Sequence, residues 1–327
     1  MSEADELIDR VLGAPRTMSS SEVAAGAGMS VEDATGYWRA MGFADVGESH
    51  AFTERDMAAL QAVQRLVSTG VLQRSEAIEV VRSLGQSSAR MAEWQTGTLA
   101  RLLARQGEIP DENAMTHEHV AKVAELTAAL LPSLEDMLTY AWRRQLAAAI
   151  QRSVDTAETE DAADAGLLCV GFADLVGFTR LTRRLPDERL ADLVTAFEAD
   201  SSDVVAATGA RLIKTLGDEV MFVAEDPQHG ADTAIELHLA HAQGEDVPQL
   251  RVGLSFGDVV TRMGDVYGST VNLASRLTAL ARPGTTLADD GCAKELLGDP
   301  RFAVRALRPR PLRGLGLVRA WSVQRGR

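Results

Sequence analysis

The sequence changes character near Gly166, and this change limits what the chain can fold into more than any single motif does. Before residue 155 the apolar residues recur at helical spacing, and several helical patterns end near a glycine. The stretch 155–166, DTAETEDAADAG, is acidic and rich in alanine, as expected of a linker. After it, short apolar runs typical of strands alternate with helical patterns. The pattern therefore predicts an all-helical domain over residues 1–155 and an α+β domain over residues 156–327.

The composition is that of a globular protein with a surplus of acidic residues. Of the 327 residues, 46% are hydrophobic and 24% are charged, which allows a core in each domain. The formal charge of −14 argues against a nucleic-acid surface, because phosphate binding needs clustered lysine and arginine. Two cysteines, Cys169 and Cys292, are too few for a disulfide framework and indicate a reducing compartment. No apolar run reaches the roughly 18 residues of a membrane span, so we expect no stable membrane insertion and a cytoplasmic location.

The helical half begins with three short helices that each follow a good N-cap residue. The predicted caps are Ser20 or Ser21, Ser30, and Thr53. This succession resembles the helix-turn-helix of bacterial regulators, whose function is DNA binding. The second helix, however, begins with two acidic residues and offers only Arg39 as a cation, whereas a reader of the major groove carries Arg, Lys, Asn or Gln. We therefore favour a helical scaffold that makes protein contacts.

Longer helical patterns follow over residues 75–103, 117–131 and 134–154. His117 and His119 stand at the start of one of them, where a titrating imidazole could sense protons. The favoured interpretation is that both histidines are simply exposed near a helix N-terminus.

The second half combines strands, hairpins and helices. Strands are predicted over 167–173, 250–256 and 258–263, a hairpin over 211–223, and helices over 175–184, 186–207, 227–242 and 266–281. The last two strands are expected to be joined tightly at Gly257. Because hairpins separate the helices, the pattern favours an α+β sandwich of ferredoxin-like character over a doubly wound parallel sheet.

Two acidic residues stand where strands end. Asp174 follows the apolar run of FADLVGFT, and Asp218 lies in the turn of RLIKTLGDEVMFV. Each one alone is more typical of a cap or a solvated turn, but two carboxylates brought together at strand ends suit Mg²⁺ beside substrate phosphates. With a two-residue turn, strand parity pairs Thr215 with Asp218 and Lys214 with Glu219. Lys214 and Asp218 are then predicted to face opposite sides of the hairpin.

Two further segments carry groups that suit a nucleotide. After the first strand, Phe178 and Thr179 open a helix whose free N–H groups can hold a phosphate. In GDVYGSTVNLASRL, Asn272 and Arg276 are four residues apart and share one helix face. Arg276 can meet phosphate charge and Asn272 can hydrogen-bond a sugar, although an exposed polar face is the alternative.

Together, FADLVGFT, RLIKTLGDEVMF and GDVYGSTVNLASRL resemble the catalytic domain of the class III nucleotidyl cyclases over about residues 165–325. The resemblance implies a head-to-tail homodimer in which each active site is shared between two chains. It also implies that Asp174 and Asp218 of one chain hold two Mg or Mn ions, with help from the backbone carbonyl of Leu175. Phe178 and Thr179 are expected near the phosphates.

The resemblance assigns the remaining groups to the other chain. Lys214 and Asp265 are implied to read the adenine of ATP, because Lys donates to N1 and Asp accepts from the N6 amine, whereas guanine presents the opposite pattern. Asn272 and Arg276 are implied to position the ribose and stabilise the transition state. Arg313, in PLRGLG, stands where the family often has a residue that contacts the terminal phosphates.

The expected function is that of an adenylyl cyclase that makes cyclic AMP and pyrophosphate from ATP. The first domain also resembles the regulatory segment of soluble actinobacterial cyclases, which implies control by pH or a lipid through the helix over 134–154. Two alternatives remain, namely a nucleotide-sensing DNA-binding regulator and a guanylyl or dual-substrate cyclase.

Overall fold

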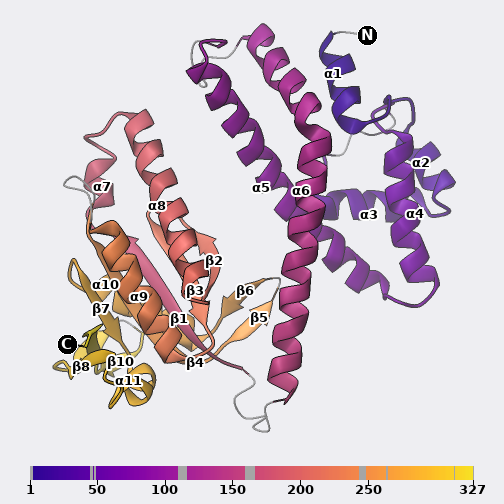
Figure 1. The fold of residues 1–327 in the computed structure, drawn as a ribbon. Coiled ribbons are helices and arrows are strands. Elements are labelled where there is room, and N and C mark those ends of the chain that lie inside the picture. The colour runs from indigo at the N-terminus through magenta and orange to yellow at the C-terminus, as the bar shows by residue number, and fades with distance from the viewer. Residues whose placement is uncertain are drawn as a thin grey trace. The chain divides into compact units, whose positions relative to one another are not determined.

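The structure is a computed structural model in which the chain forms two compact units, Met1–Arg152 and Ser153–Arg327. Its described residues are 3–44, 47, 49–109, 116–158, 166–242, 248–262, 264–312 and 314–326. The named strands in this part of the chain all belong to the second unit (Figure 1). Among the same residues, no helix combines the length and apolar composition that crossing a membrane requires.

Helices build the first unit around an aromatic core. They are α1 Glu3–Leu12, α2 Ser20–Gly26, α3 Val31–Met41, α4 Glu54–Ser68, α5 Arg74–Arg105 and α6 His117–Glu158. Trp38 of α3 stacks on Phe52 with ring centroids 4.2 Å apart, and Leu60 of α4 is fully buried in the same cluster. Asp33 of α3 forms an ion pair with Arg74 of α5. This acidic group therefore contributes to the packing of two helices.

The helix starts confirm two of the predicted caps and correct the third. Ser30 accepts a hydrogen bond from the Asp33 N–H, and Thr53 forms a capping box with Asp56. The cap of α2, however, is Ser19, so the prediction of Ser20 or Ser21 is wrong by one or two residues. The reason is a capping box that Glu22 completes three residues after Ser19, which neither of the other serines can form with it.

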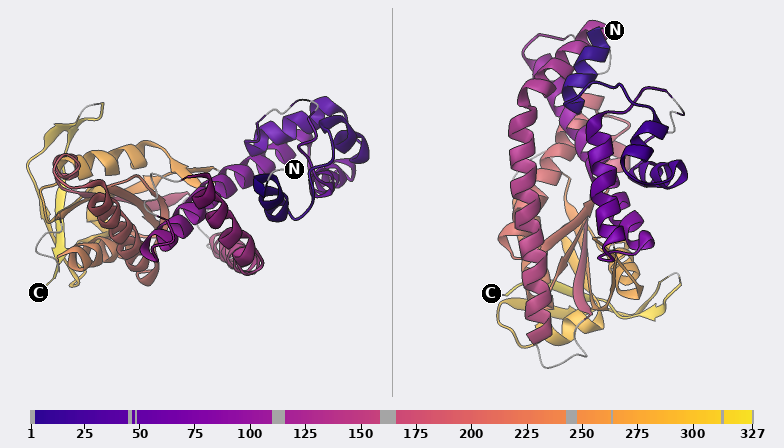
Figure 2. Two further views of the ribbon diagram at one scale, coloured as in Figure 1. Left: turned by 90° about the horizontal axis from the view of Figure 1, so that it is seen from above. Right: turned by 90° about the vertical axis from the view of Figure 1, so that its right-hand side faces the viewer.

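Helix α6 joins two segments that were predicted as separate helices. The predicted helices over 117–131 and 134–154 are parts of one helix that contains Pro132 (Figures 1 and 2). Proline cannot donate a hydrogen bond to the carbonyl of Ala128, and such a position costs about 3 kcal/mol. Pro132 is exposed, so water can satisfy this carbonyl, and the alanine- and leucine-rich sequence on both sides favours helix.

A seven-stranded sheet organises the second unit, with strand order β2-β3-β1-β4-β7-β11-β8. The strands are β1 Leu167–Leu175, β2 Arg211–Thr215, β3 Glu219–Ala224, β4 Leu250–Asp258, β7 Thr285–Ala288, β8 Phe302–Ala306 and β11 Trp321–Arg325. Neighbouring strands are antiparallel except for β4 and β7, which are parallel. Two small sheets pair β5 Val260–Arg262 with β6 Asp265–Tyr267 and β9 Arg310–Leu312 with β10 Gly316–Val318.

The two faces of the sheet are covered by different helices. These are α7 Phe178–Leu181, α8 Asp187–Ala207, α9 Pro227–His241, α10 Ser269–Leu280 and α11 Asp290–Leu296. Alternate residues of β1 go to opposite faces. Ala173 joins the core formed with α8, α9 and α11, whereas Phe172 joins the core that includes Ala274 of α10. A Cβ at Gly253 would lie 2.3 Å from the backbone N of Thr278, so this glycine lets α10 approach β4 closely.

This arrangement confirms the predicted α+β fold but corrects two connections. Strand β4 runs straight through Gly257, and β5 pairs with β6 in a separate sheet rather than with β4. Helix α10 begins at Ser269, because residues Asp265–Tyr267 are held as a strand by β5. The predicted tight turn at Gly257 and helix start at Val266 are therefore wrong.

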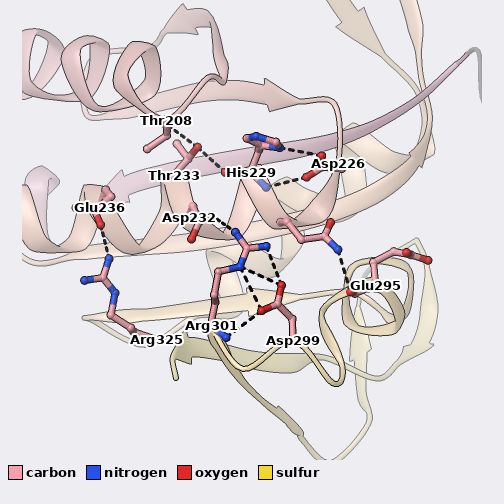
Figure 3. A network of polar contacts seen from close by, with 11 residues as sticks. Thr208, Asp226, His229, Asp232, Thr233, Glu236, Glu295, Asp299, Arg301 and Arg325 are labelled. Atoms are coloured by element: carbon pink, nitrogen blue, oxygen red, sulfur yellow. Dashed lines mark hydrogen bonds and ion pairs between the residues drawn. The ribbon is translucent and has the colours of Figure 1, made fainter. Parts of the chain in front are cut away.

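An exposed polar network joins α9 to the C-terminal strands on the side of the sheet away from α10 (Figure 3). Arg301 contacts Asp299 at 2.7 Å and Asp232 of α9 at 3.1 Å. Arg325 of β11 pairs with Glu236 of α9. Exposed ion pairs of this kind each stabilise a fold by about 1 kcal/mol or less.

Candidate active site

Three charged side chains form a row across the sheet where β1 ends. Asp174 of β1 lies opposite Glu219 of β3 and opposite Arg251 of β4. Directly opposed residues of antiparallel strands project to the same face. Asp174 has the parity of Phe172, so all three side chains lie on the α10 face of the sheet.

Arg251 holds the carboxylate of Asp174. Its Nε donates to Oδ2 of Asp174 at 2.5 Å, and its Nη2 contacts the same oxygen. Asp174 is only 8% exposed, and burial raises its pKa above the ordinary value for an aspartate. The charge and hydrogen bonds of Arg251 oppose this shift, and the nearby carboxyl of Asp218 adds to it. The site thus concentrates negative charge that a single arginine does not balance.

The turn between β2 and β3 brings Asp218 to the same place. Gly217 adopts φ 70°, and the N–H of Leu175 donates to the backbone carbonyl of Asp218 at 2.9 Å. Glu219 follows directly, and burial together with the charges of Asp174 and Asp218 raises its pKa to about 7. The two aspartates expected at a common site therefore do lie together in the structure.

The donor set suits a divalent cation that is completed by other ligands. Asp174, Asp218 and the Leu175 carbonyl offer hard oxygen atoms, which Mg²⁺ and Mn²⁺ prefer. Among the described residues, no three His, Cys, Asp or Glu side chains are arranged as a complete metal site. Two carboxylates fit an ion that keeps water and takes substrate oxygens as further ligands.

A β-bulge decides where Lys214 points. Leu212 pairs with Phe222, but Lys214 pairs with Met221, so Ile213 is an extra residue in β2. Leu212 belongs to the core below α8 and α9, whereas Met221 belongs to the core below α10. Regular alternation would place Lys214 on the same face as Leu212. The bulge instead places Lys214 on the α10 face.

The predicted hairpin register is wrong by two residues. Thr215 pairs with Val220 and Lys214 with Met221, rather than with Asp218 and Glu219. The N–H of Leu216 donates to the Glu219 carbonyl at 2.7 Å, so the two residues of the turn are Gly217 and Asp218 rather than Leu216 and Gly217. Asp218 lies within this turn, outside the ladder, so strand parity does not decide which way it faces.

Lys214 meets Asp265 across the edge of the sheet. Its Nζ donates to Oδ2 of Asp265 at 2.6 Å, and the side chains are 33% and 26% exposed. Burial opposes ionisation of Asp265, but hydrogen bonds from Lys214 and from the Val266 N–H leave its pKa lowered. The two residues expected to read a base are therefore adjacent in the fold, although 51 positions separate them in the chain.

The remaining predicted residues lie elsewhere. Asn272 and Arg276 are exposed on α10, and in the described part of one chain no hydrogen bond or ion pair joins them to Asp174 or Asp218. Phe178 packs partly against the core that α8 and α9 cover. Arg313 lies outside the described residues, as does the side chain of Thr179.

Sequence reasoning missed Glu219 and Arg251 as members of this site. Arg251 stands 77 positions after Asp174, at the start of an otherwise apolar strand. Glu219 was taken as the partner of Lys214 in the hairpin. Only the register of β3, β1 and β4 places both of them beside Asp174.

Comparison with known proteins identifies the family. Residues 161–324 match the adenylate and guanylate cyclase catalytic domain. An adenylate cyclase of Streptomyces coelicolor is 45% identical over 342 residues, which cover 96% of this chain and 88% of that protein. One of Glutamicibacter nicotianae is 38% identical over 331 residues, with coverages of 97% and 81%. A pH-sensitive adenylate cyclase of Mycobacterium tuberculosis is 33% identical over 316 residues, with coverages of 94% and 78%.

The chain therefore belongs to the adenylate and guanylate cyclase catalytic domain family. The predicted membership in the class III cyclases is confirmed, and with it the expectation of an enzyme. Members of this family generally use divalent metal ions.

Proposed function

We propose that this protein is an adenylate cyclase that converts ATP into 3′,5′-cyclic AMP and pyrophosphate. The observation that carries the proposal is the contact between Lys214 and Asp265, which presents one donor and one acceptor side by side. Adenine offers the matching acceptor at N1 and donor at N6, whereas guanine reverses this pattern. The names of the relatives in Streptomyces and Glutamicibacter agree with this choice.

Asp174 and Asp218, with the Leu175 carbonyl, would hold two Mg or Mn ions. Such ions, when bound, acidify the ribose 3′-hydroxyl and stabilise charge on the attacking and leaving oxygens at the α-phosphate. The role of the two aspartates would be to hold these ions. Because the bound ions would acidify the 3′-hydroxyl, the protein itself would need no dedicated general base. The backbone of Phe178 and Thr179 and the side chain of Arg313 are proposed to contact the phosphates.

The active site is proposed to form between two chains arranged head to tail. Asn272 would orient the ribose and Arg276 would stabilise charge that grows in the transition state. Their exposure on α10 supports this assignment, because an exposed pair can be completed by a second copy. We expect a mixture of Asp174→Ala and Arg276→Ala chains to regain activity, since each heterodimer then keeps one complete site. No recovery would contradict the shared site.

The helical domain, over residues 1–155, is proposed to regulate the catalytic domain, over residues 156–327. Helix α6 connects the two parts of the sequence and could transmit a change caused by a proton or a bound lipid. The test measures the specific activity of residues 156–327 and of the full chain in a series of buffers between about pH 5.5 and pH 8. Equal activities throughout would overturn this regulatory role.

The direct test of the proposed function is incubation with Mn²⁺ and either ATP or GTP, followed by measurement of cyclic product. Cyclic AMP is expected, with little cyclic GMP. Preferential formation of cyclic GMP would instead make the protein a guanylate cyclase.

A further inference from the structure

We propose that the hairpin of β9 and β10 docks on an anionic lipid bilayer. The docking surface consists of two leucines and four arginines that are all exposed, and we call it the hairpin patch. Its members are Leu315, Leu317, Arg305, Arg308, Arg310 and Arg319. Arg313 belongs to the same stretch of sequence but is left to the nucleotide phosphates. The inference goes beyond the cyclase function and does not depend on it.

Positive charge gathers at the C-terminal end of the chain. Residues 300–327 contain eight arginines and no aspartate, glutamate or lysine, although the whole chain has a formal charge of −14. Clustered cations on an otherwise acidic protein create a local field that attracts anions, whereas the acidic surface repels them. An anionic partner is therefore expected to meet the protein at this end of the chain.

The arginines of this segment fall into two groups. Arg301 and Arg325 pair with carboxylates of the α9 network (Figure 3). The four arginines of the hairpin patch are exposed, and within the described part of the chain none of them forms a hydrogen bond or an ion pair. A guanidinium carries five N–H donors and binds phosphate groups well. The hairpin patch therefore holds cations that the fold does not neutralise.

The leucines and the arginines occupy different parts of the hairpin. Leu317 pairs with Pro311, and Val318 pairs with Arg310, so Leu317 stands closer to the turn than Arg310 does. Leu315 lies in the turn, whereas the other arginines of the hairpin patch precede β9 or follow β10. Figure 2 shows the hairpin, in yellow, extending away from the seven-stranded sheet. Apolar side chains thus occupy the outer half of the hairpin, and arginines surround its base.

The exposure of Leu317 points to a partner with an apolar region. Its side chain is 73% exposed, more than any other large apolar side chain in the described part of the chain. Single exposed leucines are common on protein surfaces. Here, however, the exposed leucine stands beside arginines that have no partner, and the combination of an apolar patch with a charged rim is typical of an interaction site.

An anionic bilayer suits both kinds of side chain. Lipid headgroups supply phosphate oxygens to the guanidinium groups, and the boundary of the hydrocarbon region accepts leucine side chains. Nucleic acid also supplies phosphates, but proteins bind its bases with polar and aromatic side chains, and the hairpin patch contains neither. The geometry therefore favours peripheral docking, with the outer half of the hairpin at the headgroup boundary.

The experiment sediments the full chain with sucrose-loaded vesicles of phosphatidylcholine, either alone or with about 30% phosphatidylglycerol. The parent should sediment with the anionic vesicles and stay in solution with the neutral ones. Added salt should release it, because salt screens the attraction between arginines and headgroups. Sedimentation with neither kind of vesicle, or equally with both, would overturn the proposal.

A pair of double variants tests the arginines. Arg308→Gln, Arg319→Gln should weaken binding to the anionic vesicles by about tenfold, because each arginine near a charged membrane surface adds to the affinity. Arg301→Gln, Arg325→Gln is the matched control, since it removes the same charge from the same segment but from paired side chains. The control should lose no more than about threefold. Equal losses in the two double variants would show that overall charge decides binding and would contradict a role of the hairpin patch.

Leu317→Ser tests the apolar contribution. It should weaken binding to the anionic vesicles by about fivefold, because less apolar surface leaves water. Leu297→Ser is the matched control, since Leu297 is 53% exposed and lies at the end of α11, outside the hairpin patch. Parent-like binding of Leu317→Ser would show a purely electrostatic contact and would overturn the assignment to a bilayer. Circular dichroism verifies that each variant is folded.

Two further measurements distinguish the bilayer from other partners. Fluorescence anisotropy with a labelled DNA duplex should show weaker binding than the anionic vesicles do, and the reverse order would assign the hairpin patch to nucleic acid. Analytical ultracentrifugation should give the same oligomeric state for the parent and for Leu317→Ser. A smaller assembly of Leu317→Ser would show that a second copy of the chain covers the hairpin patch, and would likewise overturn the proposal.

Discussion

Two sets of arginine and carboxylate side chains lie on opposite sides of the seven-stranded sheet and behave differently. On the α10 side, Arg251 lies near the carboxylates of Asp174, Asp218 and Glu219, of which Asp174 is buried and the other two are partly buried. On the α9 side, Arg301 contacts both Asp232 and Asp299, and Arg325 contacts Glu236, so every one of these carboxylates touches an arginine (Figure 3). The residue types are the same, but the number of charges and their burial are not.

The pKa values show what this difference means. Hydrogen bonds from Arg301 lower the pKa of Asp299, as expected of a paired carboxylate near the surface. Burial raises the pKa of Asp174 although Arg251 contacts it as closely. An arginine contact alone is therefore a poor marker of function. The excess of carboxylates over arginine around the buried Asp174 is the reason for proposing the cation site on the α10 side.

The largest expected difference between the two sets concerns activity. Asp174→Asn should lower cyclase activity with Mn²⁺ by at least about 100-fold, because the metal ions proposed to bind there would stabilise the transition state by several kcal/mol. Asp299→Asn removes the same charge from the α9 network and should leave activity unchanged. The rate of cyclic AMP formation at saturating ATP is measured for both variants and for the parent. Parent-like activity of Asp174→Asn would show that the carboxylates on the α10 side matter no more for catalysis than those of the α9 network.

Substrate choice is the second expected difference. The variant Lys214→Glu, Asp265→Cys exchanges the donor and acceptor pattern, so the preference for ATP over GTP should fall by roughly 10- to 100-fold. Lys294→Glu changes an exposed lysine of α11 and serves as the control for charge. The readout is the ratio of kcat/KM for the two nucleotides. An unaltered ratio in the double variant would argue that other residues select the base.

A smaller difference is expected in how much Arg251 and Arg301 each contribute to the free energy of unfolding. Arg251→Ala removes charged hydrogen bonds from a buried carboxylate and should lower the free energy of unfolding by about 2 kcal/mol. Arg301→Ala removes exposed contacts and should lower it by less than about 1 kcal/mol. Urea denaturation of the metal-free protein measures both. Equal losses would show that burial does not distinguish the two networks.

The smallest expected effect is the pH dependence of the α9 network. The pKa of Asp299 is lower in the folded chain than in the unfolded one, so the unfolded state binds its proton first as the pH falls. Its contribution is complete above the unfolded pKa of about 4 and disappears as the pH falls through the folded pKa. Thermal unfolding between pH 6 and pH 3 should therefore show a slightly weaker acid dependence for Asp299→Asn. An identical slope would indicate that this pair contributes nothing.

Local sequence signals predicted much of the helical unit and the order of elements in the catalytic one. Ser30 and Thr53 were found as caps because a cap and its partner lie within three residues. The two helices expected over 117–131 and 134–154 form one helix through Pro132, and the tight turn expected at Gly257 did not occur. Proline and glycine indicate only a local preference, which a long helix or a central strand can override.

The candidate site shows the same division. Asp174 and Asp218 could be paired from sequence because each follows or interrupts a strand in a recognisable motif. Arg251 and Glu219 could not, since their place beside Asp174 depends on the registers of β3, β1 and β4. The bulge at Ile213 is another such feature, because one extra residue reverses the face that Lys214 joins.

By itself, the sequence determined the class of protein and the division into a helical part and an α+β part. These follow from short motifs and from periodicities that each element carries alone. Tertiary structure decided which charges share a face and that Asp174 among them is buried. The physical reason is that strand register and burial depend on contacts between segments far apart in the chain, and those contacts set how strongly each charge acts on the next.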